Sequence, residues 1–187
     1  LFISFLVCFT SLIVDGYIQY IFGKNLIGYE LYSNYRVSSF FGPELILGSY
    51  LARFFPILFG LFIFFDKSKK SKVLLFFLTI VFILSEGLIF LSGERLALFF
   101  MNLSAVYIIL MLNKYKTYRL WTYICSLFLI FVLLNIFPSS KERLIDQTID
   151  DFTINKSTNV EDEIYIFSKS HNDMYVTAYR IFLDNKI

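Results

Sequence analysis

The chain has 187 residues, of which 57% are hydrophobic and 20% aromatic, and its mean hydropathy is +0.66. A soluble domain typically contains ~45–50% apolar residues, and the excess here lies in long runs, which indicates a protein that crosses a membrane several times. The formal net charge of only +2 argues against a nucleic-acid partner. Cys8 and Cys125 both lie within apolar runs, so they predict neither a disulfide framework nor a metal site.

Long apolar runs predict an all-α, polytopic bundle of transmembrane helices over residues 1–137, followed by an extramembrane region at 138–187. The first run, at residues 1–14, shows no charged leader and no small-residue cleavage site, so we interpret it as the truncated tail of a transmembrane helix rather than a signal peptide. We therefore expect the chain to be a piece of a longer protein. The complete spans predicted by hydropathy are residues 45–65, 73–91, 96–112 and 120–137.

Basic residues in two short loops predict the orientation of the bundle. Residues 66–72 contain four lysines, and residues 113–119 contain two lysines and an arginine. Alternation of the spans puts both loops on one side, and the positive-inside rule makes that side the cytoplasm. Residues 15–44, 92–95 and 138–187 are then expected together on the opposite, outer side.

The last part of the chain predicts an amphipathic helix. Apolar residues recur at helical spacing from His171 to Leu183, at Tyr175, Tyr179 and Phe182 among others. A single apolar face suits a helix that lies on the membrane or on the bundle.

Four basic residues are the candidates for chemistry. Arg53 lies within a predicted span, where a guanidinium keeps its charge at a cost of at least ~2.5–3.5 kcal/mol, so it is a functional candidate. Arg36, Arg95 and His171 lie in segments expected on the outer side. Because the planar fork of arginine offers two parallel donors to phosphate, the set predicts a site for a diphosphate head group at the outer interface.

Each candidate also has a simpler interpretation. Arg36 would be solvated in a polar loop, Arg53 would snorkel to the lipid head groups, and Arg95 would pair with a neighbouring glutamate. His171 would be an exposed loop residue. The acidic residues Asp15 and Glu86 are further candidates that could equally mark the ends of spans.

The sequence predicts no metal site and no cofactor. It contains one histidine and no carboxylate cluster at a ligand spacing. It also contains neither a glycine-rich phosphate loop of the G-x-x-x-x-G-K type nor a serine in a G-x-S-x-G context.

Several stretches together resemble a known family. They are RVSSFFGPELILGSYLARFFP at residues 36–56, SGER at 92–95, the long outer loop after the last span, and SHNDMYVTAYRIFLDNKI at 170–187. In this order they are similar to the O-antigen ligases and O-antigen polymerases, bacterial inner-membrane proteins that handle lipid-linked glycans. The chain departs from the family by lacking its earlier spans and the glycine-rich continuation after Ile187.

The resemblance implies an all-α polytopic fold and a metal-independent glycosyltransferase that serves lipopolysaccharide biosynthesis. The donor would be a glycan on undecaprenyl diphosphate, and the outer side would be the periplasm. The acceptor would be a lipid A core for a ligase, or another lipid-linked glycan for a polymerase. The functional arginines of the family correspond to Arg36, Arg53 and Arg95, and its loop histidine corresponds to His171.

These implications and the residues lead to one hypothesis. Arg53 and Arg95, helped by Arg36, bind the donor diphosphate and stabilise the charge that grows as the sugar leaves, while His171 orients or deprotonates the acceptor hydroxyl. Two alternatives are a transporter or flippase of lipid-linked sugars, and a non-catalytic membrane subunit whose arginines only anchor helices.

Overall fold

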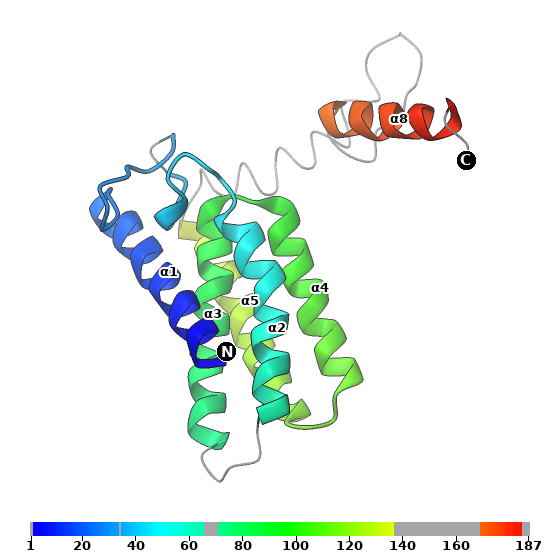
Figure 1. Cartoon of the computed structure of the whole chain (residues 1–187). Helices are drawn as coiled ribbons and strands as arrows, with labels where there is room; N and C mark the ends of the chain where they lie inside the picture. The colour runs from blue at the N-terminus through cyan, green and yellow to red at the C-terminus, as the bar shows by residue number, and fades with distance from the viewer. Residues whose placement is uncertain (1, 34, 66–70, 137–168, 185–187) are drawn as a thin grey trace. The chain divides into compact units, whose positions relative to one another are not determined.

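The computed structural model of the chain describes residues 2–33, 35–65, 71–136 and 169–184. These residues are helical apart from loops and two isolated β-bridges, so the predicted all-α fold is confirmed. In chain order the elements are α1 (Phe2–Phe22), the 3-10 turn η1 (Ser39–Phe41), α2 (Leu47–Phe65), α3 (Ser71–Ser92), α4 (Arg95–Met111), α5 (Lys116–Ile136) and α8 (Lys169–Asp184). Helices α1 to α5 form one compact unit, and α8 belongs to a second unit (Figure 1).

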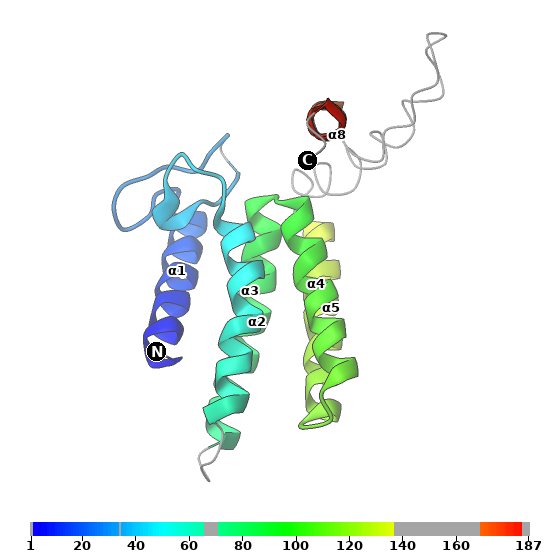
Figure 2. The same ribbon diagram turned by 45° about the vertical axis from the view of Figure 1, so that its right-hand side comes forward.

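The bundle has the helices of a multi-pass membrane protein. Within the described residues, α1, α2, α3 and α5 are each long and apolar enough to cross a membrane, and α4 is a shorter apolar helix of 17 residues. Helices that follow one another in the chain run in opposite directions (Figure 2). The loop before α2 and the α3–α4 turn therefore share one end of the bundle, here called the upper end, and the α4–α5 turn lies at the lower end.

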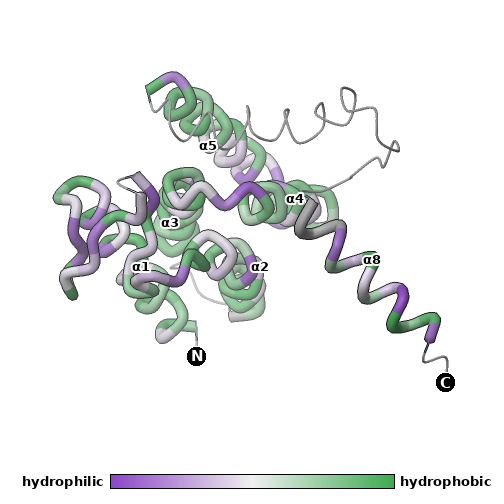
Figure 3. Tube along the Cα trace, turned by 90° about the horizontal axis from the view of Figure 1, so that it is seen from above, coloured by the Kyte–Doolittle hydropathy of each residue, from purple (hydrophilic) through white to green (hydrophobic). Residues whose placement is uncertain are grey.

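Helix α3 is the centre of the bundle. It packs against α1, α2, α4 and α5, and Leu78, Leu88 and Ile89 on it are almost completely buried. Seen from above, α3 lies between α1 and α5, with α2 and α4 on the same side of it (Figure 3). Its remaining face carries exposed apolar residues such as Phe76, Ile80 and Leu84, as expected for a helix that also meets lipid.

Two predicted helix boundaries were wrong. Helix α1 continues to Phe22 rather than ending near residue 14, so Asp15 and Gly16 lie inside it. Helix α5 begins at Lys116 rather than at residue 120, which places Arg119 in a helix and not in a loop. In both cases a polar residue within the helix finds protein partners, so it does not need to lie at the water-facing end of a span. Residues 66–70 and 137–168 lie outside the described part, so the predicted loops there are not addressed.

Buried polar groups of α1 hold the loop of residues 23–46 on the upper end. Asp15, which is completely buried, accepts hydrogen bonds from Ser39 Oγ (2.8 Å), the Leu26 amide (2.9 Å) and Asn25 Nδ2 (3.3 Å). Gln19, one turn further along α1, binds backbone groups of the same loop through both its amide oxygen and its amide nitrogen. The loop that precedes α2 is thereby fixed to the bundle.

The described part of the second unit is the helix α8. It spans Lys169–Asp184, which confirms the helix predicted from His171 to Leu183. Large apolar side chains on it, such as Met174, Tyr179 and Phe182, are exposed within the chain.

Candidate functional site at the α3–α4 turn

Arg36 fastens the loop to the upper end of α3. Its side chain is only 6% exposed, and Nε donates a hydrogen bond to the Ser92 carbonyl at 2.8 Å. The Val37 amide donates to the Leu91 carbonyl at 3.4 Å. The last carbonyls of a helix have no partner within it, so Arg36 and its neighbour supply donors at the point where α3 ends. The interpretation of Arg36 as a solvated loop residue was wrong.

Glu94, in the turn between α3 and α4, binds the beginning of α2. Its carboxylate oxygens accept hydrogen bonds from the Gly48 amide (2.6 Å), the Ser49 amide (2.9 Å) and Ser49 Oγ (2.6 Å). Free amides and the helix dipole make the first turn of a helix a favourable place for a negative charge. One carboxylate therefore joins the start of α2 to the α3–α4 turn, although the two lie 45 residues or more apart in sequence.

Gly48 permits this close approach. A Cβ added at Gly48 would lie 2.7 Å from Ser92 Oγ and 3.0 Å from Glu94 Oε1, both shorter than an ordinary contact. Gly60 lies on the same helix, and a Cβ added there would meet nothing within 4 Å.

Gly48→Ala is expected to lower the free energy of unfolding by about 1–3 kcal/mol, because the new methyl group pushes α2 away from the turn. Gly60→Ala is the matched control, and we expect it to be neutral or to stabilise α2 by up to about 1 kcal/mol. Chemical unfolding of the purified variants in detergent measures both. Equal effects of the two substitutions would contradict close packing at Gly48.

Arg53 and Arg95 lie beside the contact between Glu94 and α2. Arg95 is the first residue of α4, directly after Glu94, and is partly buried. Arg53 is exposed on α2, four residues after Ser49, and residues four apart share one side of a helix. Helices α2 and α4 also pack against each other. The structure thus places Arg36, Arg53 and Arg95 on elements that meet at the α3–α4 turn, which is one of the hydrophilic stretches at the upper end in Figure 3.

His171 cannot be placed in this arrangement. It lies in the first turn of α8, in the second unit, and its side chain is outside the described part. Its proposed role with the three arginines stays a prediction.

Arg119 is a buried cation that the sequence analysis assigned to a basic loop. It is 8% exposed and donates hydrogen bonds from Nη1 to the Ile108 carbonyl (2.6 Å) and from Nη2 to the Leu112 carbonyl. Its guanidinium lies 5.7 Å from the centre of the Phe59 ring, within range of a cation–π interaction. Arg119 therefore supplies donors to carbonyls at the lower end of α4. Its position next to the apolar run of α5 was the feature of the sequence that could have indicated its burial.

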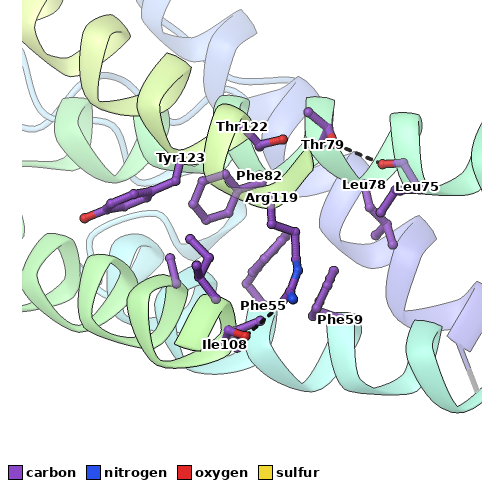
Figure 4. Close-up of a pocket in the computed structure, with 12 residues that line it drawn as sticks. Phe55, Phe59, Leu75, Leu78, Thr79, Phe82, Ile108, Arg119, Thr122 and Tyr123 are labelled. Atoms are coloured by element: carbon purple, nitrogen blue, oxygen red, sulfur yellow. Dashed lines mark hydrogen bonds between the residues drawn. The ribbon is translucent and has the colours of Figure 1, made fainter. Parts of the chain in front are cut away.

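Arg119 also lines a cavity of ≈ 50 Å³ between α2, α3, α4 and α5 (Figure 4). Most of the lining is apolar, and Thr79, Thr122 and Tyr123 contribute the other polar side chains. None of Arg36, Arg53 and Arg95 lines it. The cavity is therefore separate from the candidate site, and the three arginines do not converge on it.

Two acidic residues within spans have different surroundings. Asp15 has several donors from the loop, as described above, so its burial is explained by a structural role. Glu86 is completely buried in α3 and contacts Asn102 of α4. Neither residue marks the end of a helix.

Comparison with known proteins adds no further assignment. No protein-family model matches the chain, and neither a curated protein nor a solved structure matches it. The functional interpretation therefore depends on the residues and on their geometry.

Proposed function

We propose that the protein is a membrane glycosyltransferase of the O-antigen ligase or polymerase type, which moves a glycan from undecaprenyl diphosphate to an acceptor hydroxyl. The observation that supports this most is the binding of Glu94 to the start of α2. It holds the helix that carries Arg53 against the turn that ends in Arg95. The two helices that carry these arginines are thus joined close to both residues.

The charges at the upper end suit a diphosphate. Arg36, Arg53 and Arg95 bring three positive charges to the elements around the α3–α4 turn, and the carboxylate of Glu94 is already occupied by donors of α2. Arg36 Nε is bound to Ser92, so its contribution is to shape the turn and to add positive potential. Arg53 and Arg95 are then the residues that contact the diphosphate, each able to donate two parallel hydrogen bonds.

The proposed reaction is a displacement at the anomeric carbon. The acceptor oxygen forms a bond to this carbon, and the bond from the carbon to the diphosphate oxygen breaks, so the electron pair leaves with the diphosphate. Arg53 and Arg95 stabilise the negative charge that develops on that oxygen. The acceptor proton passes to His171, which is the proposed base.

A glycan-transfer assay tests the proposal. Membranes that contain the protein and a lipid-linked glycan donor should form the transferred product, and Arg53→Ala and Arg95→Ala should each reduce the rate at least ~100-fold. Lys114→Ala, which removes an exposed cation at the lower end, should leave the rate unchanged. Normal transfer by both arginine variants would refute the proposal. The product itself separates the acceptors, because a ligase attaches the glycan to a lipid A core and a polymerase lengthens the lipid-linked chain.

A further inference from the structure

The Glu86 carboxyl group is buried in the upper half of α3 with half of its acceptors unused. It lies six residues before the end of the helix, or ~9 Å along the axis. Oε2 accepts a hydrogen bond from Asn102 Nδ2 at 3.4 Å, whereas Oε1 is buried and has no hydrogen-bond partner among the described residues. Buried polar atoms are nearly always paired, so Oε1 calls for an explanation.

Two neighbouring helices also contribute buried polar atoms without a hydrogen-bond partner among the described residues. Asn102 Nδ2 also donates a hydrogen bond to the Leu98 carbonyl at 2.8 Å, and both of its partners are acceptors, as an amide nitrogen requires. The other amide atom, Oδ1, is a buried acceptor without a partner on α4. On α5, Ser126 Oγ is buried and unpaired within the described part. Glu86 Oε1 and Asn102 Oδ1 are both acceptors, so this pair of side chains lacks a donor.

Helix α5 reaches α3 at the level of Glu86. A Cβ built on Gly87 would lie 3.6 Å from Leu129 Cδ2, and Ser126 is one turn from Leu129 on α5. Tyr123 lies three residues before Ser126, on the same side of α5. Glu86, Asn102 and Ser126 therefore belong to the region where α3, α4 and α5 pack together.

The groups around Glu86 offer no positive charge. Helix α1 contributes Tyr17, whose hydroxyl donates to the Leu84 carbonyl at 3.0 Å, and α5 contributes Tyr123. Helix α4 contributes the neutral Asn102, and the charged residue of α2, Arg53, is exposed. In the described chain Glu86 has no ion-pair partner. An ionised carboxylate would be an uncompensated charge in an apolar interior, which is strongly unfavourable.

We propose that Glu86 is a proton-binding site within the bundle, and that it links α3 to α4 as a neutral carboxylic acid. A proton on Oε1 converts one unpaired acceptor into a donor beside Asn102, whose Oδ1 is itself an unpaired acceptor. A divalent metal ion suits the site less well, because the described residues contain no group of three or more histidine, cysteine or acidic side chains. This inference is independent of the proposed glycan transfer.

Infrared spectroscopy of the purified protein at neutral pH tests the proposal directly. The wild-type spectrum should contain the carbonyl stretch of a protonated carboxylic acid, and this band should be absent from Glu86→Gln. Glu44→Gln is the matched control, because Glu44 is exposed, and it should leave the band unchanged. Loss of only carboxylate bands in Glu86→Gln would overturn the proposal.

Thermal unfolding provides a second measurement. Glutamine is neutral and can also donate a hydrogen bond, so Glu86→Gln should unfold within about 2 °C of the wild type, a shift that corresponds to a small change in stability. The unfolding temperature of the wild type should not depend on whether the salt is sodium or choline chloride. A stabilisation by sodium that disappears in Glu86→Gln would show that the carboxylate binds a metal cation, and would overturn the proton assignment.

Discussion

Asp15→Ala is expected to lower the free energy of unfolding by about 3–5 kcal/mol, the largest effect of any single substitution considered for this protein. The carboxylate accepts three hydrogen bonds from the loop before α2, from Ser39 Oγ, the Leu26 amide and Asn25 Nδ2. Removing it takes away three hydrogen bonds to a carboxylate, each of which contributes about 1.5–3 kcal/mol. The Leu26 amide loses its acceptor, whereas Ser39 Oγ and Asn25 Nδ2 keep the Leu12 and Ser39 carbonyls. Chemical unfolding in detergent, followed by circular dichroism, measures the change.

Two further variants define the cause of this effect. Asp15→Asn keeps the shape and one acceptor oxygen, but its amide group faces donors, so it should lose part of the stability. Ser11→Ala is the matched control on α1, since Ser11 is exposed and bonds only to the Cys8 carbonyl of its own helix. An Asp15→Ala protein as stable as the Ser11→Ala protein would show that the loop is held by other contacts.

Glu94→Ala is expected to have the second largest effect, because it acts on stability and on transfer together. Loss of three hydrogen bonds to the start of α2 should reduce the free energy of unfolding by about 2–3 kcal/mol. Glu94 is a positioning residue in the proposed mechanism, since it touches α2 rather than the donor. Its removal should therefore lower the transfer rate at least ~10-fold through the displacement of Arg53 from Arg95.

The proposed positioning role can be separated from simple destabilisation. Glu94→Gln keeps the length of the side chain and one acceptor oxygen, so it should recover part of both the stability and the rate. Glu44→Ala removes an exposed carboxylate from the loop at the same end of the bundle and should change neither. The rate should be measured well below the unfolding temperature of each variant. Full transfer activity in a clearly destabilised Glu94→Ala protein would refute the role.

Hydropathy predicted the architecture because membrane helices are long and uniformly apolar. The boundaries of α2, α3 and α4 differ from the predicted ones by at most two residues. The errors at α1 and α5 have one physical origin. Asp15 and Arg119 look like the ends of spans, since a charged residue normally lies near water, but here each has buried backbone or side-chain partners.

The candidate site was predictable only in part for a similar reason. Arginines within or beside apolar runs can be recognised as functional candidates from the sequence, since their charge is unfavourable there. The partners of Arg36 and Glu94 are contacts between segments 45 or more residues apart, and no local pattern reveals them. Without the fold, Glu94 is one of two glutamates near Arg95 and has no distinguishing feature.

The contact between Arg119 and the end of α4 has a consequence for the surrounding lipid. Helix α4 has 17 residues, a length of ~25 Å, whereas the hydrocarbon core of a bilayer is ~30 Å thick. Because a guanidinium satisfies carbonyls at the lower end of α4, this helix can stop before it reaches the level of the head groups. Acyl chains next to α4 should then be compressed, so a reconstituted sample should be more stable in short-chain than in long-chain phosphatidylcholine.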